Sequence, residues 1–175
     1  GYEFVDSIKG GVIPGKFVPS VDRGIREAAQ KGVIAGFPLE DFTAECYDGS
    51  YHSVDSSDIA FKLAGSTAFK NVAQQAGPTL LEPIIEVAVT TPDEYMGDVT
   101  GDITSRRGKV MGMEADSGRT TIKARVPEAE LYKYAAALRS MTSGRAHHSR
   151  EFVGYEPVPS DAAKAIIAAA KKEKE

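Results

Sequence analysis

The first half of the chain alternates between the apolar spacing of strands and that of helices. Glycine and proline clusters separate these stretches, and Gly77-Pro78 is the predicted boundary of a first domain, residues 1–77. The pattern predicts a strand at 2–8, a helix from Pro19 that Gly32 ends, a strand at 39–47, and a helix that runs to about Gln75. This order indicates a small α/β domain.

The long helix before Gly77 has two features that bear on its packing. Asp55 and Asp58 form an approximate capping box at its start. Its predicted buried face carries small and apolar residues at helical spacing, namely Phe61, Gly65, Ala68, Phe69 and Val72. We expect Gly65 to allow a close approach to a sheet.

The second half, residues 78–175, predicts the order β-α-β-β-α-β. Ile85, Val87 and Val89 alternate with polar or small residues, as in a strand with one buried face. The remaining predictions are a helix capped by Thr91-Pro92-Asp93-Glu94, strands at 107–113 and 120–126 joined by the turn 116–118, a helix from Pro127 to about Met141, and a strand at 150–155. That order is typical of the ferredoxin-like fold. An alanine-rich helix at 161–170 and a frayed charged tail at 171–175 complete the prediction.

Composition narrows the class of protein. With 42% hydrophobic and 26% charged residues the chain is expected to be globular, and its formal net charge of −4 argues against a protein that coats nucleic acid electrostatically. Cys46 is the single cysteine and no apolar run is long enough to cross a bilayer, so the cytoplasm is the expected compartment. The start at Gly1 lacks an initiator methionine and a signal peptide, which indicates a fragment with missing upstream sequence.

The residue pattern argues against three kinds of catalytic or metal site. His52 lies among serines and aspartates, but a Ser-His-Asp triad is usually drawn from separate segments and no nucleophile elbow occurs. A metal site would need His52 with Asp48 and Asp55, or His147, His148 and Glu151, and adjacent histidines on a strand point to opposite faces. No phosphate-binding Gly-x-x-x-x-Gly-Lys-Ser/Thr motif is present, so the chain is not expected to hydrolyse nucleotide.

Two glycine-containing loops are the favoured candidates for binding. Gly10 to Lys16 and Asp48 to Ser57 each connect a strand to the start of a helix, where exposed backbone N–H groups favour phosphate. Tyr51 or His52 can stack on a base, and His52 can bond a ribose hydroxyl. Spacing alone favours ordinary connecting loops with a capped helix.

Basic residues form a second candidate. Arg106-Arg107-Gly108-Lys109 is the densest cluster before the tail, and it suits either phosphate contact or a solvated strand edge. Arg139 and Arg145 lie near a helix end, where cations favour the helix dipole without any ligand.

Many ordered motifs together resemble the C-terminal part of elongation factor G, or a divergent paralogue of it, over nearly the whole chain. The motifs are Gly10-Gly11-Val12-Ile13-Pro14, Tyr47-Asp48-Gly49-Ser50-Tyr51-His52, Val54-Asp55-Ser56-Ser57, Ala60-Phe61-Lys62, Leu81-Glu82-Pro83, Tyr95-Met96-Gly97-Asp98, Ser105-Arg106-Arg107-Gly108 and Leu138-Arg139-Ser140. The resemblance implies that residues 1–77 are a domain IV of the ribosomal protein S5 domain 2-like fold, beginning after its first strand. It implies that residues 78–175 are a ferredoxin-like domain V.

The resemblance also implies a function as the ribosome-docking part of a translational GTPase that promotes translocation. The implied partners are 16S and 23S ribosomal RNA, the stalk base, and transfer and messenger RNA in the A site, with no membrane and no small-molecule substrate. GTP and Mg²⁺ would belong to a G domain outside this fragment, which itself has no catalytic residue or cofactor. The implied contact residues are Gly10, Gly11, Val12, Ile13, Pro14, Gly15, Lys16, Ser50, Tyr51, His52 and Ser53, and from the basic cluster Arg106, Arg107 and Lys109.

Three departures from the family pattern favour a specialised relative as an alternative. They are Gly15-Lys16-Phe17 in place of Lys-Glu-Tyr, Glu128 with Tyr132-Lys133-Tyr134 in place of a leucine and Phe-Gly-Tyr, and Thr142-Ser143-Gly144-Arg145 in place of Thr-Gln-Gly-Arg. Such a paralogue would act in ribosome recycling or ribosome protection. A remote alternative is a stand-alone hydrolase that uses His52.

Overall fold

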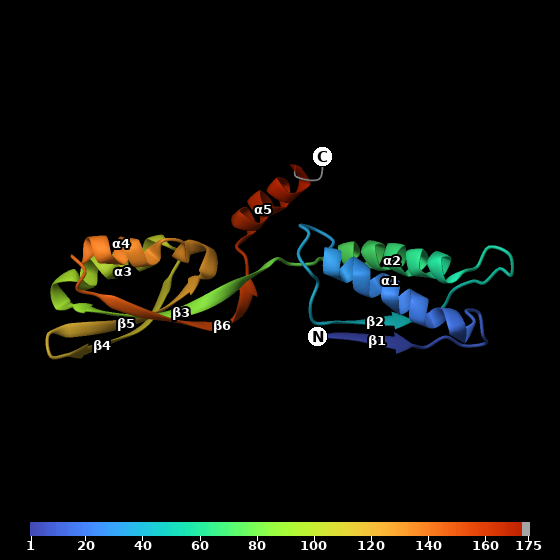
Figure 1. Cartoon of the computed structure of the whole chain (residues 1–175), viewed down its shortest axis with the longest axis horizontal. Helices are drawn as coiled ribbons and strands as arrows, with labels where there is room; N and C mark the ends of the chain where they lie inside the picture. Colours follow the sequence, from blue (N-terminus) through green and yellow to red (C-terminus); the bar gives the residue numbers. More distant parts are fainter. Residues whose placement is uncertain (173–175) are drawn as a thin grey trace. The chain divides into compact units, whose positions relative to one another are not determined.

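The chain forms two α/β units, each with its own sheet (Figure 1). This computed structural model describes residues 1–172. One unit comprises Gly1–Thr79 together with the segment that begins at Pro159, and the other comprises Leu80–Val158. The predicted α+β class with two small domains is confirmed by these two separate sheets.

The first unit has a two-stranded parallel sheet covered by two helices (Figure 1). Its elements are β1 (Tyr2–Asp6), the 3-10 turn η1 (Gly15–Phe17), α1 (Val18–Lys31), β2 (Phe42–Cys46) and α2 (Asp58–Gln75). In the sheet Tyr2 is opposite Phe42 and Asp6 is opposite Cys46, so α1 is the crossover between two parallel strands. The core lies between the sheet and the helices and contains Ile13, Phe17, Val18, Val21, Ile25 and Phe61.

Two glycines let α1 and α2 pack closely. A Cβ added to Gly24 would lie 2.0 Å from the backbone oxygen of Lys62, and one added to Gly65 would lie 2.7 Å from that of Val21. The expectation that Gly65 faces a sheet is therefore wrong, because its neighbour is the other helix. The predicted buried face is also partly wrong, since Val72 is 66% exposed and Ala73 is buried in its place.

The start of α2 differs from the predicted capping box. Ser57 is the N-cap, and its Oγ atom accepts the backbone N–H of Ala60 at 3.1 Å. Asp58 is the first helical residue, and its carboxylate accepts the hydroxyl of Ser20 at 2.7 Å. Asp55 therefore lies in the preceding loop and does not cap the helix.

The second unit has the predicted ferredoxin-like topology. Its elements are β3 (Leu81–Pro92), η2 (Asp93–Tyr95), α3 (Met96–Ser105), β4 (Lys109–Asp116), β5 (Arg119–Pro127), η3 (Glu128–Leu131), α4 (Tyr134–Met141) and β6 (His147–Pro157). The sheet order is β4-β5-β3-β6, and β3 pairs antiparallel with both β5 and β6. Figure 1 shows α3 and α4 on one face of this sheet.

The alternation of apolar residues along β3 and β5 produces the core of this unit. Val87, Val89, Ile122 and Ala124 are fully buried, and they pack against α3 and α4 residues such as Ile103 and Leu138. The predicted hairpin between β4 and β5 is confirmed. Ser117 and Gly118 form its turn with positive φ angles of 50° and 79°, as the right-handed twist of a tight hairpin favours.

Two helix starts in this unit differ from prediction. Thr91 is not a cap, because it lies in β3, is fully buried, and its hydroxyl has no hydrogen-bond partner among the described residues. The helix predicted from Pro127 to Met141 is broken into η3 and α4. Lys133 adopts the left-handed conformation at φ 54° between them, which lets Leu131 and Tyr134 both point into the core.

The last described element is α5 (Ser160–Lys172). Lys171 and Lys172 belong to this helix, so the prediction that they are part of a frayed tail is wrong. The rest of the predicted tail, 173–175, lies outside the described residues. Over residues 1–172, no helix is both long enough and apolar enough to span a membrane.

Candidate nucleic-acid interface

The structure brings the two predicted loops together at one end of the first unit. Gly49 contacts Ile13 so closely that an added Cβ would lie 2.5 Å from the Cδ1 atom of Ile13. The rings of Phe17 and Tyr51 lie 6.0 Å apart, and Phe17 also stacks on Phe61 at 4.7 Å. These contacts join segments that are more than thirty residues apart in the sequence into one surface.

The first loop is anchored at its centre and exposed around the anchor. Ile13 is only 5% exposed and belongs to the core, whereas Gly10, Gly11, Val12 and Lys16 are exposed. Gly10 and Gly11 have positive φ angles of 67° and 68°, and an added Cβ at either would meet nothing within 4 Å. The space beside this backbone is therefore open.

The end of the first loop is held by a short turn. The backbone N–H of Phe17 donates to the carbonyl of Pro14 at 2.9 Å. The Nζ atom of Lys16 lies 4.8 Å from the Phe17 ring, so its charge is held beside an aromatic face while its side chain remains exposed.

The second loop is a hydrogen-bonded turn. The backbone N–H of His52 donates to the Oγ atom of Ser56 at 3.0 Å, and the N–H of Ser56 donates to the carbonyl of His52 at 3.0 Å. Tyr51 is 41% exposed and Val54 is 89% exposed, while Ser50, His52 and Ser53 are exposed as well. The loop thus presents aromatic, imidazole and apolar side chains on an ordered backbone.

The helix start beside the second loop is less suited to phosphate than its position suggests. Ser57 already satisfies one free N–H group of α2, and the Asp58 carboxylate lies in the first turn. That carboxylate offsets the positive end of the helix dipole and repels an anion. Together with Asp48 and Asp55 in the same loop, it gives this end of the unit mixed charge rather than a basic surface.

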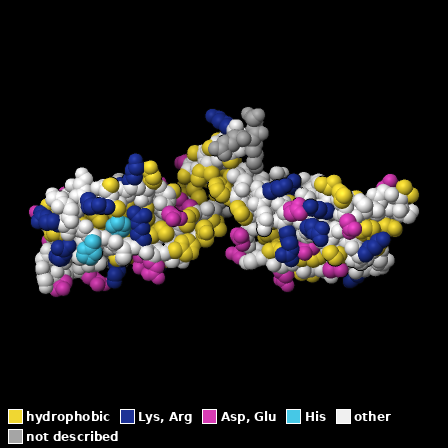
Figure 2. All heavy atoms as spheres, in the orientation of Figure 1, with side chains coloured by type: hydrophobic (Ala, Val, Ile, Leu, Met, Phe, Trp, Pro, Cys, Tyr) yellow, Lys and Arg dark blue, Asp and Glu magenta, His cyan; other side chains and the backbone are white. Residues whose placement is uncertain are grey.

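On the face seen in Figure 2, basic residues do not gather into one large patch. Figure 2 shows Lys and Arg interspersed with Asp and Glu over the visible face of both units. Binding to nucleic acid through this surface would accordingly depend on shape and on local contacts more than on net charge.

Arg107, in the second unit, is occupied by carboxylates. Its guanidinium donates to both oxygens of Glu82 at 2.8 Å and to Glu130 at 2.9 Å. The hydrogen bonds to Glu82 are the largest cause of the raised pKa of Arg107. Such a bidentate pair fixes the guanidinium, so Arg107 links the α3–β4 junction to β3 and η3.

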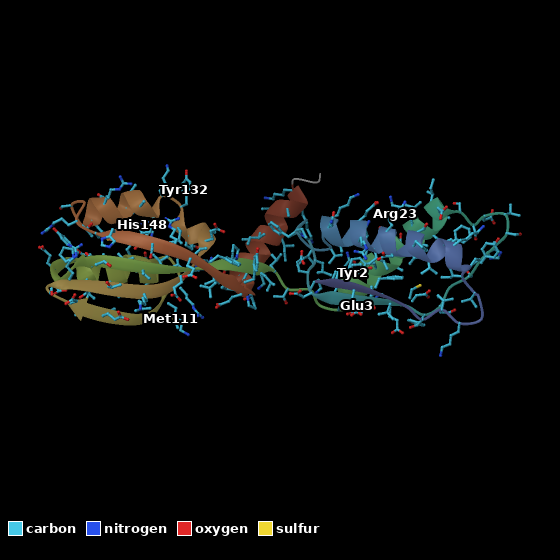
Figure 3. All side chains as sticks on the ribbon, turned by 60° about the horizontal axis from the view of Figure 1, so that its bottom comes forward. Tyr2, Glu3, Arg23, Met111, Tyr132 and His148 are labelled. Atoms are coloured by element: carbon cyan, nitrogen blue, oxygen red, sulfur yellow. The ribbon has the colours of Figure 1, made fainter. Side chains whose placement is uncertain are left out.

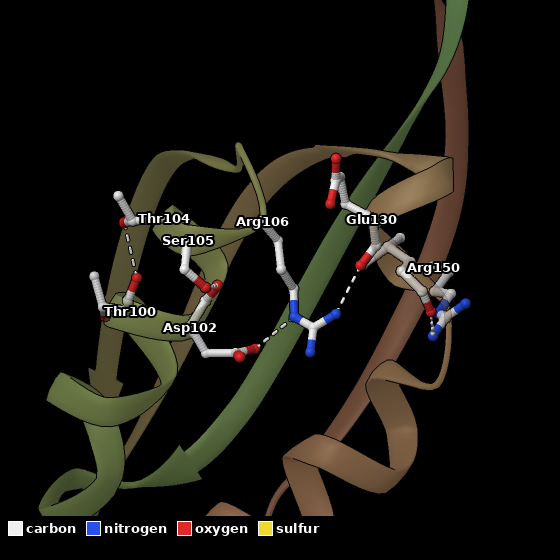
Figure 4. Close-up of polar contacts among 8 residues, drawn as sticks. Thr100, Asp102, Thr104, Ser105, Arg106, Glu130 and Arg150 are labelled. Atoms are coloured by element: carbon white, nitrogen blue, oxygen red, sulfur yellow. Dashed lines mark hydrogen bonds and ion pairs between the residues drawn. The ribbon is translucent and has the colours of Figure 1, made fainter. Parts of the chain in front are cut away.

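Arg106 is held in a similar way (Figure 4). Its Nε atom donates to Asp102 at 2.8 Å, one terminal nitrogen donates to the Glu130 carbonyl at 2.7 Å, and the guanidinium lies over the Tyr134 ring. Lys109, at the start of β4, is exposed and has no ion-pair partner among residues 1–172. Of the three predicted basic contacts, Lys109 is therefore the one whose charge is free in this structure.

The hydrolase and metal alternatives gain no support. Within the described part of the chain, the His52 imidazole makes no hydrogen bond to a serine or an aspartate. His148 accepts a hydrogen bond from the Arg150 Nε atom at 3.1 Å, so one nitrogen that a metal would use is engaged. No group of three or more metal-ligating side chains comes together in residues 1–172.

Sequence reasoning missed the role of Phe17 in holding the two loops against each other. Phe17 was noted only as a departure from the family pattern, yet it contacts Tyr51, Phe61 and Lys16. The available signal was an apolar residue directly after a glycine-rich loop, at the start of a helix with an apolar face.

Two protein-family models match this chain, one over each part of it. The description "Elongation factor G, domain IV" matches residues 1–77, and "Elongation factor G C-terminus" matches residues 79–166. The chain therefore belongs to the elongation factor G family. The predicted resemblance is confirmed.

The relatives are close in sequence and in structure. Elongation factor G of Aquifex pyrophilus is 54% identical over 167 residues, which cover 95% of this chain and 24% of that protein. A crystal structure from Thermus thermophilus matches with a TM-score of 0.83 and 46% identity, over 98% of this chain and 26% of the other. The chain thus spans about a quarter of the length of the curated relative it matches.

Proposed function

We propose that this chain is the ribosome-docking part of a translation elongation factor and that it promotes movement of transfer and messenger RNA. The loops Gly10–Lys16 and Ser50–Ser53 enter the decoding-side A site. The observation that carries this proposal is the pairing of both loops through Ile13 with Gly49 and Phe17 with Tyr51. Two loops fixed to each other and to the core of an α/β unit form a tip that transmits force.

The tip acts by shape rather than by chemistry. Its exposed Val12, Tyr51 and Val54 occupy space that transfer RNA would need in order to move backward. Tyr51 stacks on a base and His52 bonds a ribose hydroxyl, as aromatic and imidazole side chains do in RNA recognition. The open backbone at Gly10 and Gly11 allows close approach of a phosphate.

The second unit contacts large-subunit ribosomal RNA through Lys109. Arg106 and Arg107 hold the backbone that presents this lysine, because their own charges are paired within the unit. GTP and Mg²⁺ are bound by a separate G domain of the longer protein, which supplies the energy. This chain contributes docking and no catalytic residue.

A chimera tests the proposal and separates it from a recycling role. The corresponding quarter of Aquifex pyrophilus elongation factor G is replaced by this chain, and the chimera is assayed on ribosomes for translocation and for subunit splitting. We expect translocation at a rate near that of the parent. A chimera that splits subunits and does not translocate would instead support the specialised paralogue.

A further inference from the structure

The second unit carries an open groove of about 550 Å³ that has no part in the proposed tip. It lies where η3 gives way to α4, beside β6. The side chains that matter for its chemistry are Glu128, Leu131, Tyr132, Lys133, Tyr134 and Arg150. A volume of this size accommodates a ligand of several tens of atoms at most.

The break between η3 and α4 produces the groove. Lys133 is in the left-handed conformation, which interrupts the helical path between Tyr132 and Tyr134. Tyr134 consequently points into the core and is 1% exposed, whereas Tyr132 points outward and is 76% exposed. Figure 3 shows Tyr132 projecting from the ribbon. A free aromatic ring at the edge of a groove is a platform for another ring.

The charge beside this ring is positive and unpaired. Arg150 donates to the ring nitrogen of His148 and to the Leu131 carbonyl at 3.4 Å, both neutral groups (Figure 4 shows the latter bond). Among residues 1–172 neither Arg150 nor Lys133 has a carboxylate within ion-pair distance, in contrast to Arg106 and Arg107. Lys133 lies with its Nζ atom 5.1 Å from the Tyr132 ring, so cation and ring adjoin.

One further observation agrees with a positive potential here. The pKa of His148 is lowered, first by burial and then by the nearby charges of Arg150, Arg139 and His147.

We propose that this groove binds a nucleoside monophosphate unit, whose base stacks on Tyr132 and whose phosphate is held by Arg150 and Lys133. Guanidinium and ammonium groups are the usual phosphate ligands, and stacking on a tyrosine is tolerant of base identity. Glu128 is the one carboxylate among the described side chains that line the groove, and it disfavours a purely anionic ligand without an aromatic part. A free nucleotide and a nucleotide within an RNA strand share this chemistry.

The test uses the whole chain with three probes: adenosine monophosphate, adenosine, and a six-residue adenylate strand. Binding is measured by titration calorimetry, and the site is located by amide chemical shifts in NMR spectra. We expect shifts at residues 131–135 and 148–151, with adenosine at least about fivefold weaker than its monophosphate because the charged contact is absent. Arg150→Gln and Tyr132→Ala are each expected to weaken the monophosphate on the order of tenfold.

Arg139→Gln is the matched control, because Arg139 is a neighbouring cation outside the groove lining. This variant is expected to change the affinity for adenosine monophosphate less than about twofold, because it alters only the long-range electrostatic potential at the groove. Thermal unfolding checks that each variant is folded. If adenosine monophosphate binds and shifts the signals of residues 131–135 and 148–151, the groove is assigned to free nucleotides. If only the adenylate strand binds, with shifts at the same residues and weaker binding by both groove variants, the groove is assigned to RNA. Shifts elsewhere, or affinity unchanged in both groove variants, would overturn the proposal.

Discussion

Gly49 and Ile13 form the contact on which the paired loops depend. The two residues lie on different loops, and an added Cβ at position 49 would come within 2.5 Å of the Ile13 Cδ1 atom and 2.8 Å of its Cγ1 atom. Ile13 is itself 5% exposed and packs in the core of the first unit. The position of the second loop is thus tied to the core through a side chain of the first.

Gly49→Ala should loosen this contact. The added methyl group forces Ile13 to move within a packed core, which is expected to destabilise the first unit by about 1–2 kcal/mol. Chemical denaturation followed by NMR signals of the first unit measures the change. Gly15→Ala is the control, since a Cβ there meets nothing within 4 Å. Equal stability of the two variants would show that the loops are not held by this contact.

Gly24→Ala should be more damaging than Gly49→Ala. The new Cβ would lie 2.0 Å from the Lys62 carbonyl oxygen, and the backbone of α2 cannot yield as a side chain can. We expect a loss of about 3 kcal/mol or more, because α1 and α2 must separate. Gly101→Ala in α3 has open space and is expected to stabilise its helix by about 0.5–1 kcal/mol. Thermal unfolding of both variants decides whether stability is lost through the clash between α1 and α2 or through the replacement of a helical glycine as such.

Lys133→Gly should stabilise the second unit. A lysine at φ 54° carries a steric cost of about 1 kcal/mol that glycine does not, and the resemblance noted in the sequence implies glycine at this position. Urea midpoints compare this variant with Lys133→Ala, which removes the same charge and keeps the strained conformation. Only the glycine variant should gain stability, and a similar gain in both would point to the charge as the cause.

The stability of the second unit should fall with acid through His148. Burial first, and then the charge of Arg150, lowers the pKa of His148 in the folded state, whereas the unfolded chain titrates near 6.5. Above that value both states are neutral, and the contribution is fully present. As pH falls below it the unfolded state binds the proton more readily, so stability is lost toward the folded pKa.

His148→Gln isolates this effect, because an amide oxygen can still accept from Arg150 and does not titrate. Urea unfolding at pH 7.5, 6.5 and 5.5 should show a steeper loss for the unaltered chain than for the variant. Parallel pH profiles would mean that His148 does not contribute.

Elements set by local pattern were predictable, and those set by distant contacts were not. The alternation of Val87 and Val89 with polar or small residues predicted β3, because in a strand the polarity of each residue follows from whether its own side chain is buried. The break at Lys133 was missed, since it depends on Leu131 and Tyr134 both reaching the same core. Thr91 looked like a helix cap by spacing, but β3 continues through it in the sheet.

The same distinction applies to the candidate site. Glycines and exposed aromatic residues marked the two loops, whereas the contact between Ile13 and Gly49 joins segments that no local pattern connects. Arg107 appeared as a free cation in the sequence. Its carboxylate partners lie 25 and 23 residues away, so its structural role emerged only from the fold.

The paired loops are proposed to act as a docking tip during translocation. The most direct test of this role is the single-turnover translocation rate of the Aquifex chimera carrying this chain, with Gly49–His52 replaced by a neutral linker of equal length. We predict a large loss of rate with GTP hydrolysis retained, while a neutral linker of matching length in the hairpin turn at 116–118 of the second unit leaves translocation unaltered. An unchanged translocation rate in the Gly49–His52 variant would show that the paired loops are not a docking tip.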